Sequence, residues 1–474
     1  MKAGFAQVDI TPPAGTHLSG SGMGDRRAME KALDPLFARA AVFEDDSRRV
    51  CLLALDLCIV TEEFTARVRG EAARRFGLLP DAVMVHPLQI HSAPSCGPMM
   101  LDQDFPLEIT PDTEYLTGSE SAYTDLAVEG AVRAIGEAGA ACRPARVGCG
   151  RGMLDRFAFN RRGLQRTGGV AMPWPVGRKN LPLGPVDLVA MEGPSDPEVG
   201  VLCVYGDDGA PLNLLLHHSC HPVCVFANPE TYRQASADWP GAWSAALAGL
   251  CPPGLSPLVL NGCCGNLNPW DPFEPDFKPD HRRMGQALAD LSKKVLATLS
   301  PDPDATVDFR QERIALDYRD VPADRLREVE RILEESPVPR RRADGSSDVD
   351  PDWFLAASTK SIEYCRRRLP RFLYEIQVFR IGQAVIVGLP GEPFVEGQIA
   401  LKLASPAPFT FVAHLTSHYV GYIPTREACA RGGHEAHPLC TYWAKLAPDS
   451  LDRIVARTTR LVNDVYTRPA APAA

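Results

Sequence analysis

The chain has 474 residues, of which 45% are hydrophobic and 23% are charged, a composition typical of a globular enzyme with a large core. The formal net charge of -9 argues against nucleic acid as the main partner, because proteins that bind it usually carry a basic face. No apolar run approaches the ~20 residues that span a bilayer, so no membrane partner is expected. The composition leaves the oligomeric state open.

The first thirteen residues reach a Thr-Pro-Pro turn before an apolar segment can form, so they do not have the pattern of a secretion signal. We therefore expect the protein in the cytoplasm. In that reducing compartment the 14 cysteines would be thiols and not a disulfide framework.

The first elements along the chain alternate between strands and a helix. Residues 37–60 predict two strands joined by a turn at 44–47, residues 61–76 have helical spacing, and residues 82–85 are an apolar strand. This order predicts an α/β fold with mixed, partly parallel sheets and flanking helices.

The remaining elements continue the same alternation. We expect helices at 123–140, 237–250 and 280–299, a hairpin at 199–226, and strands at 258–260, 374–387 and 409–415. Residues 320–370 are charged and helical, with an interruption at 343–352, and predict an insertion or lid. We expect one catalytic domain over residues 1–465 and a disordered tail at 466–474.

Residues 217–224 hold three of the chain's 11 histidines and two of its cysteines, the densest group of potential metal ligands. Neighbouring residues of a strand point to opposite faces, so these side chains do not all converge if the strand continues. His221 is the candidate ligand, and Cys220 and Cys224 are interpreted as packing residues.

Four polar groups follow directly after predicted strands: Gln89 with His91, His221, residues 261–269, and Glu392. In open α/β sheets ligands bind beyond the carboxyl ends of strands, so we expect these groups to converge on an active site there. Imidazole and carboxylate are usual ligands of zinc or a similar divalent ion.

Seven short motifs then occur in the order found in the catalytic domain of the neutral/alkaline ceramidase family, which the chain resembles over residues 4–465. They are VDITPP at 8–13, IHSAP at 90–94, SCHP at 219–222, SADWPG at 236–241, GNLNP at 265–269, GLPGE at 388–392 and GYIPT at 421–425. The resemblance implies a zinc-dependent amidohydrolase with that family's fold. It also implies His221, Glu392 and Tyr422 as zinc ligands and Arg161 as a substrate-binding residue.

The chain departs from the family pattern at several matching positions. Gln89 stands where the family has its first histidine ligand, and His91 matches the second histidine of that motif. The serine nucleophile falls on Asn268, which cannot attack a carbonyl, and a tyrosine near the scissile bond falls on His434. The family's C-terminal immunoglobulin-like domain has no counterpart, so we expect a small soluble substrate.

The resulting hypothesis is a hydrolase that cleaves an amide, or an ester, by means of water activated by the metal. His91 or His434 would transfer the proton, Asn268 and the backbone N–H groups of 265–267 would form an oxyanion hole, and Arg161 would hold an anionic part of the substrate. His91 could instead replace the missing ligand.

Two other interpretations stay open at this point. Cys263 or Cys264, at a tight turn, could supply a thiolate nucleophile for a transferase or biosynthetic tailoring enzyme, although both could also be packing residues. The third interpretation is a non-catalytic, ligand-binding relative that keeps the fold.

Overall fold

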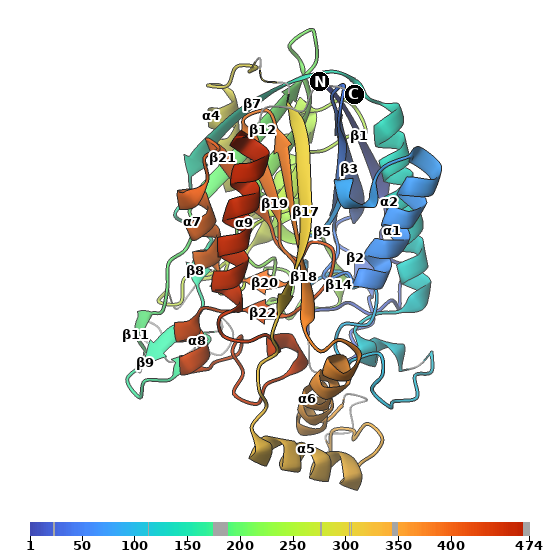
Figure 1. Ribbon diagram of the computed structural model, residues 1–474, viewed down its shortest axis with the longest axis vertical. Helices are drawn as coiled ribbons and strands as arrows, with labels where there is room; N and C mark the ends of the chain where they lie inside the picture. Colours follow the sequence, from blue (N-terminus) through green and yellow to red (C-terminus); the bar gives the residue numbers. More distant parts are fainter. Residues whose placement is uncertain are drawn as a thin grey trace.

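The computed structural model describes residues 1–21, 24–111, 113–173, 188–274, 277–302, 304, 306–343 and 349–467. Within these residues the larger sheets are mixed, their strands stand side by side, and helices lie on their outer faces (Figure 1). The α/β prediction with partly parallel sheets and flanking helices is confirmed.

The first sheet has the strand order β5-β4-β3-β1-β6 and is covered by two helices. Its strands are β1 (Lys2–Asp9), β3 (Phe37–Glu44), β4 (Arg49–Leu55), β5 (Val83–Pro87) and β6 (Arg143–Pro144). Helices α1 (Glu62–Phe76) and α2 (Ser121–Ala140) pack on it and on each other. β4 and β5 are parallel because α1 forms the crossover between them. The predicted hairpin in 37–60 and the helix after it are confirmed.

The second sheet has the order β15-β13-β12-β7. Its strands are β7 (Arg146–Met153), β12 (Glu198–Tyr205), β13 (Pro211–His218) and β15 (Leu258–Asn261), and its helices are α3 (Asp238–Leu247) and α4 (His281–Leu296). β12 and β13 form the expected hairpin, but the strand ends at His218 and does not reach residue 226. Residues 219–226 are therefore a loop, so strand alternation does not orient His221.

The third sheet has the order β17-β18-β19-β21. Its strands are β17 (Val307–Leu316), β18 (Phe372–Ile381), β19 (Ala384–Gly388) and β21 (Phe409–Ala413), with helices α7 (Val395–Ala404) and α9 (Ser450–Thr467) beside them. The stretch expected as strand at 374–387 is two antiparallel strands, because Gly382 turns the chain with φ 56°. Helix α9 includes residues 466 and 467 of the expected tail, and residues 468–474 lie outside the described residues.

Apolar side chains from all three sheets meet in one core. Phe43 and Leu53 of the first sheet, Leu214 of the second, and Phe379 and Ile386 of the third belong to the same buried cluster. Each of these side chains has no exposed surface. Shared burial of this kind fixes the sheets relative to one another, and with them the loops that follow their strands.

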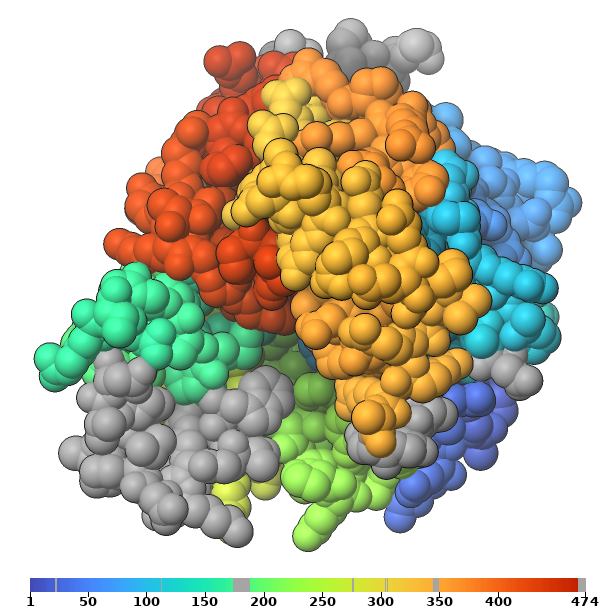
Figure 2. Space-filling view, turned by 90° about the horizontal axis from the view of Figure 1, so that it is seen from below, coloured from blue at the N-terminus to red at the C-terminus, as the bar shows by residue number. Residues whose placement is uncertain are grey.

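The predicted helical stretch at 320–370 forms α5 (Ala323–Glu335) and α6 (Pro351–Arg368) at the lower end of Figure 1. Figure 2 shows this insertion lying across the middle of the lower face, beside the segment around residues 420–445. Val329 and Trp353 of the insertion share a buried cluster with Tyr422 and Trp443. The insertion therefore supports one wall of the candidate site, and its action as a lid stays a prediction.

Short elements connect the sheets near the candidate site. They are β2 (Lys31–Ala32), β8 (Phe159–Asn160), β9 (Gly163–Gln165), β10 (Val170–Ala171), β11 (Leu188–Met191), β14 (Gln234–Ala235), β16 (Leu267–Asn268), β20 (Glu392–Pro393), β22 (Tyr422–Ile423) and α8 (Arg426–Arg431). Four 3-10 turns, η1 (Pro80–Ala82), η2 (Glu114–Thr117), η3 (Ala248–Leu250) and η4 (Tyr442–Ala444), complete the described elements. None of the helices described is long and apolar enough to cross a membrane.

Candidate functional site

Two of the four polar groups expected to converge, Gln89 with His91 and Glu392, line one cavity, and His221 lies behind it against Glu392. The cavity has an empty volume of about 550 Å³. Its polar part is lined by Gln89 and His91 after β5, Glu392 after β19, Tyr422 after β21, and His434. Residues up to 423 positions apart in the sequence, Gly20 and Trp443, thus share one cavity, which the shared core holds in place.

His221 and Glu392 form the centre of this site. The ring atom Nε2 of His221 lies 3.3 Å from Oε2 of Glu392, and both side chains are fully or almost fully buried. The other ring nitrogen, Nδ1, lies 2.6 Å from the carbonyl oxygen of Cys264. A carbonyl oxygen only accepts hydrogen bonds, so Nδ1 carries the proton and Nε2 of the neutral ring presents a lone pair to the carboxylate.

Two buried hydrogen-bond acceptors that face each other repel, unless a proton or a cation lies between them. Neither Nε2 of His221 nor Oε2 of Glu392 has a hydrogen-bond partner. Burial raises the pKa of Glu392 and lowers that of His221, because both charged forms lose their water. A proton or a cation between the two atoms would remove this conflict.

The distance between these two atoms fits a shared divalent cation. Two ligands at about 2.1 Å from a tetrahedral zinc lie roughly 3.4 Å apart, and the observed separation is 3.3 Å. No group of three or more His, Cys, Asp or Glu side chains that could hold a metal occurs within the described part of the chain. Further protein ligands at this site would therefore have to come from Tyr422 or Gln89.

Tyr422 and Gln89 contact the carboxylate of Glu392. β20 and β22 pair in parallel with Glu392 opposite Tyr422, and the phenol is one of the neighbours that lower the pKa of Glu392. Burial and then the negative charge of Glu392 raise the pKa of Tyr422, so its hydroxyl keeps its proton. Tyr419, from the same loop, donates a hydrogen bond of 3.2 Å to Oε1 of Glu392. The sequence patterns did not single out Tyr419.

Gln89 is oriented by a thiol. Its backbone has a φ of 65°, in the left-handed region, and its amide oxygen accepts a 3.4 Å hydrogen bond from Sγ of Cys264. The side chain also lies near Glu392 and is one of the neighbours that lower the pKa of that carboxylate. The amide oxygen of Gln89, the atom predicted as a metal ligand, is therefore turned toward Cys264 in this structure.

The thiols of Cys263 and Cys264 do not have the surroundings of a nucleophile. Both are fully buried, and neither lines the cavity. Burial raises the pKa of Cys264 well above its ordinary value and also raises that of Cys263, because a thiolate would lose its water there. These features favour the interpretation of both cysteines as packing residues. Cys220 and Cys224 are also buried, and burial likewise raises the pKa of each thiol.

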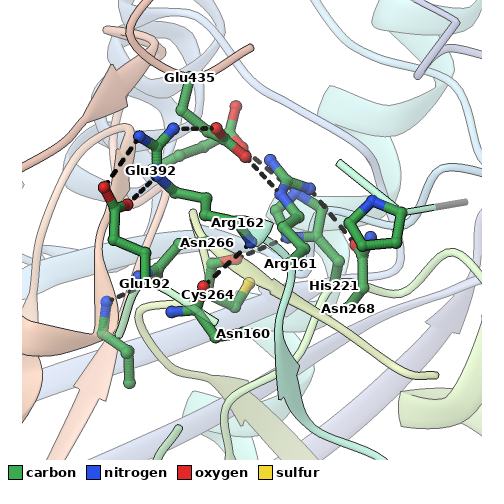
Figure 3. A network of polar contacts seen from close by, with 12 residues as sticks. Asn160, Arg161, Arg162, Glu192, His221, Cys264, Asn266, Asn268, Glu392 and Glu435 are labelled. Carbon is green, nitrogen blue, oxygen red and sulfur yellow. Dashed lines mark hydrogen bonds and ion pairs between the residues drawn. The ribbon is translucent and has the colours of Figure 1, made fainter. Parts of the chain in front are cut away.

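Arg161 and Asn268 stand beside the His221 and Glu392 pair, as Figure 3 shows. Nη1 of Arg161 donates to Oδ1 of Asn268 over 3.4 Å. The antiparallel pairing of β8 with β16 brings these two segments together. Nη2 of Arg161 and Nδ2 of Asn268 are both buried without a partner. The site therefore holds two unpaired donors close to two unpaired acceptors.

Glu435 balances the positive charge of this region and was not identified by sequence reasoning. It lies between two guanidinium groups in Figure 3, with Oε1 at 2.7 Å from Nε of Arg161 and Oε2 at 2.7 Å from Nη1 of Arg162. Burial would raise the pKa of Glu435, but the charges of both arginines hold it at about 2. Arg161 is thus already paired, which reduces its capacity to hold a fully charged anion. Only its place next to His434 in the sequence could have suggested Glu435.

His91 and His434 both line the cavity. Nδ1 of His91 is buried without a partner, and the ring packs against His221 at 5.5 Å between centroids. The ring of His434 packs at 5.5 Å from Tyr422 and 6.3 Å from Trp443. Burial lowers the pKa of both histidines, so both rings are neutral at neutral pH.

Two solved structures resemble the molecule over its whole length. The neutral ceramidase from Pseudomonas aeruginosa matches with a TM-score of 0.69 and 18% identity, over 100% of this chain and 76% of that protein. A ceramidase complexed with C2 matches with a TM-score of 0.68 and 19% identity, over 99% of this chain and 77% of that protein. The chain has the ceramidase fold. The predicted resemblance is therefore confirmed for the architecture.

The ceramidase fold is not accompanied by a match at the level of sequence. No protein-family model matches the chain, and no curated protein matches it. At 18–19% identity the structural likeness establishes the fold, and the chemistry has to be argued from the side chains of the site itself.

Proposed function

We propose that this ceramidase-fold protein is a metal-dependent hydrolase of an amide bond, or an ester bond, in a small soluble substrate. The observation that carries the proposal is the buried pair of facing, unpartnered atoms, Nε2 of His221 and Oε2 of Glu392, 3.3 Å apart beside a cavity. An enzyme site commonly holds such unmet polar groups, because substrate or cofactor completes them.

His221, Glu392 and Tyr422 would hold the cation, which we propose to be zinc. A zinc ion bound there would supply a Lewis acid for the substrate carbonyl and an acidified water. His221 is suited to this role because its Nδ1 proton is fixed by the carbonyl oxygen of Cys264, which leaves Nε2 free to bind. Gln89 would help to orient the carboxylate of Glu392.

Arg161 and Asn268 would bind the oxygen of the scissile carbonyl. Their free atoms, Nη2 and Nδ2, are buried donors without partners, and donors fixed before the reaction stabilise negative charge that develops on an oxygen. Glu435 keeps Arg161 in place and neutralises much of its charge. We therefore propose a neutral carbonyl group, rather than a free carboxylate, as the main substrate group at Arg161.

His91 would accept the proton from water and pass it to the leaving group. Its ring is neutral, lines the cavity, and has an unpartnered nitrogen. Burial lowers its pKa, so it is available as a base at neutral pH. His434 lies at the aromatic wall and would contact the substrate from that side.

The absence of a hydroxyl nucleophile at Asn268 supports attack by water, and the high pKa of the Cys264 thiol weighs against a cysteine mechanism. The cysteines are all unpaired thiols, which agrees with a cytoplasmic location, where we propose that the protein acts.

Turnover of a panel of small amides and esters, measured before and after chelation, tests this proposal. We expect hydrolysis that chelation abolishes and that zinc restores, and a loss of about 10³-fold or more in His221→Ala. His281→Gln, a histidine on α4 that bonds to Asp34 away from the cavity, is the matched control and should keep full activity. Activity that survives chelation, or saturable binding without any turnover, would contradict the proposal.

A further inference from the structure

The cavity that Glu392 lines also contains an unpaired indole. Trp443 lines the cavity and is only 6% exposed. Its N–H group is buried and donates to no protein acceptor. Buried tryptophan N–H groups nearly always have a partner, because an unmet donor retains the full cost of its lost hydration. The bound molecule is the natural source of this partner.

The position of Trp443 is fixed by its neighbours. Gly421 has a φ of 89°, and a Cβ there would lie 2.5 Å from the carbonyl oxygen of Trp443, so the two backbone segments touch. On the side-chain side, the ring of His434 lies 6.3 Å away at an interplanar angle of 30°. His437 packs edge-on at 6.4 Å. The indole is therefore a rigid element of the wall.

The remaining lining near Trp443 is apolar. Cys58, Ile59 and Met99 belong to one small buried cluster, against which Met100 and Tyr419 pack. All five of these residues line the cavity. Thioethers pack favourably against aromatic rings, and aromatic side chains accept a ring in stacked or edge-on contact. The cavity thus has a polar, reactive part and a largely apolar part into which the N–H group of Trp443 is set.

We propose that the substrate carries, next to the scissile bond, an aromatic ring with a hydrogen-bond acceptor that pairs with the N–H of Trp443. The inference rests on the proposed function for the identity of the reacting bond. The unpaired indole decides against a saturated chain, because a chain would fill the apolar part and leave the donor without a partner. The aromatic and thioether walls favour a ring as the carrier of the acceptor.

Calorimetric binding of simple amides tests this inference. The probes are 2-, 3- and 4-methoxybenzamide, the three methylbenzamides of similar shape without the acceptor, and octanamide as the saturated chain. At one ring position we expect the methoxy compound to bind about tenfold more tightly than its methyl counterpart, the effect of one hydrogen bond. Octanamide should bind more weakly than that methoxy compound.

Trp443→Phe is the decisive variant, since it keeps an aromatic ring in the wall and removes only the N–H donor. It should reduce the methoxy preference to within about twofold, and its thermal unfolding should show that the fold is kept. Octanamide binding as tightly as the best methoxybenzamide, a preference that persists in Trp443→Phe, or no binding of any probe at millimolar concentration would overturn the inference. Binding needs no turnover, so ring preference without hydrolysis would count only against the proposed function.

Discussion

Two buried glutamates of this protein have opposite surroundings. Glu375 and Glu392 are 1% and 2% exposed. Glu375 accepts two hydrogen bonds from Arg69, at 3.1 and 2.9 Å, and its pKa is about 2, because Arg69 outweighs the effect of burial. Glu392 accepts a hydrogen bond from Tyr419 and faces a lone pair of His221, and burial raises its pKa although the charge of Arg161 lowers it. Glu375 has an ion pair of its own, whereas the arginine beside Glu392, Arg161, is paired with Glu435.

Removing Arg69 from its ion pair with Glu375 should have the largest effect on stability. In Arg69→Met the buried carboxylate of Glu375 loses both hydrogen bonds from Arg69 and keeps the hydrogen bond from Gln311 and the longer contact to Arg313, so we expect the free energy of unfolding to fall by about 3 kcal/mol. Glu392→Gln, measured in the presence of a chelator, should leave stability unchanged or raise it by up to about 1 kcal/mol. Denaturant unfolding of both variants checks the contrast. Equal destabilisation by the two substitutions would remove the distinction between the two sites.

The contribution of Glu375 to the free energy of unfolding should depend on pH. The pKa of Glu375 is depressed from 4.5 to about 2, so its contribution is fully present above pH 4.5 and is lost as the pH falls toward 2. The stability advantage of wild type over Glu375→Gln should therefore decrease by about 2 kcal/mol between pH 6 and pH 3. Unfolding measured at both pH values tests this. An advantage that is independent of pH would mean that the Arg69 pair does not hold the pKa down.

Replacing Gln89 by histidine should strengthen zinc binding beside Glu392. Gln89→His places an imidazole at the position where the amide oxygen is now turned to Cys264, and the left-handed φ of 65° is one that histidine tolerates. We expect zinc affinity to increase about tenfold, as measured by competition with a chromogenic chelator. Unchanged affinity would show that position 89 does not face the cation.

The smallest effect is expected from Cys264→Ala. The substitution removes the donor to Gln89 but no group that reaches the cavity, so turnover should change by less than about threefold and stability by about 1 kcal/mol. A loss of turnover to background, with zinc content and fold unchanged, would instead support the cysteine mechanism.

Most of the architecture and the placement of the site could be predicted from the sequence. Strand, helix and strand patterns located the long elements, and the rule that sites follow the carboxyl ends of strands pointed to Gln89, His221 and Glu392, of which Gln89 and Glu392 share the cavity and His221 contacts Glu392. Such patterns depend on local periodicity and on the topology of sheets, which a single sequence carries.

The contacts that decide the chemistry could not be predicted in this way. The amide of Gln89 is oriented by Cys264, 175 positions away, and Arg161 is paired with Glu435, 274 positions away. His221 lies in a loop after a strand that ends at His218, so its direction is set by the hydrogen bond to Cys264 and not by strand alternation. Tertiary packing alone determines these partners.

Metal analysis of the purified protein after equilibration with zinc is the most direct test of whether a cation binds at His221 and Glu392. We predict about one zinc per chain in the wild type, with no excess zinc in Glu392→Gln and His221→Ala, and full occupancy in the control His281→Gln. A folded wild-type protein that retains no divalent metal, or zinc that stays bound in both site variants, would contradict this account.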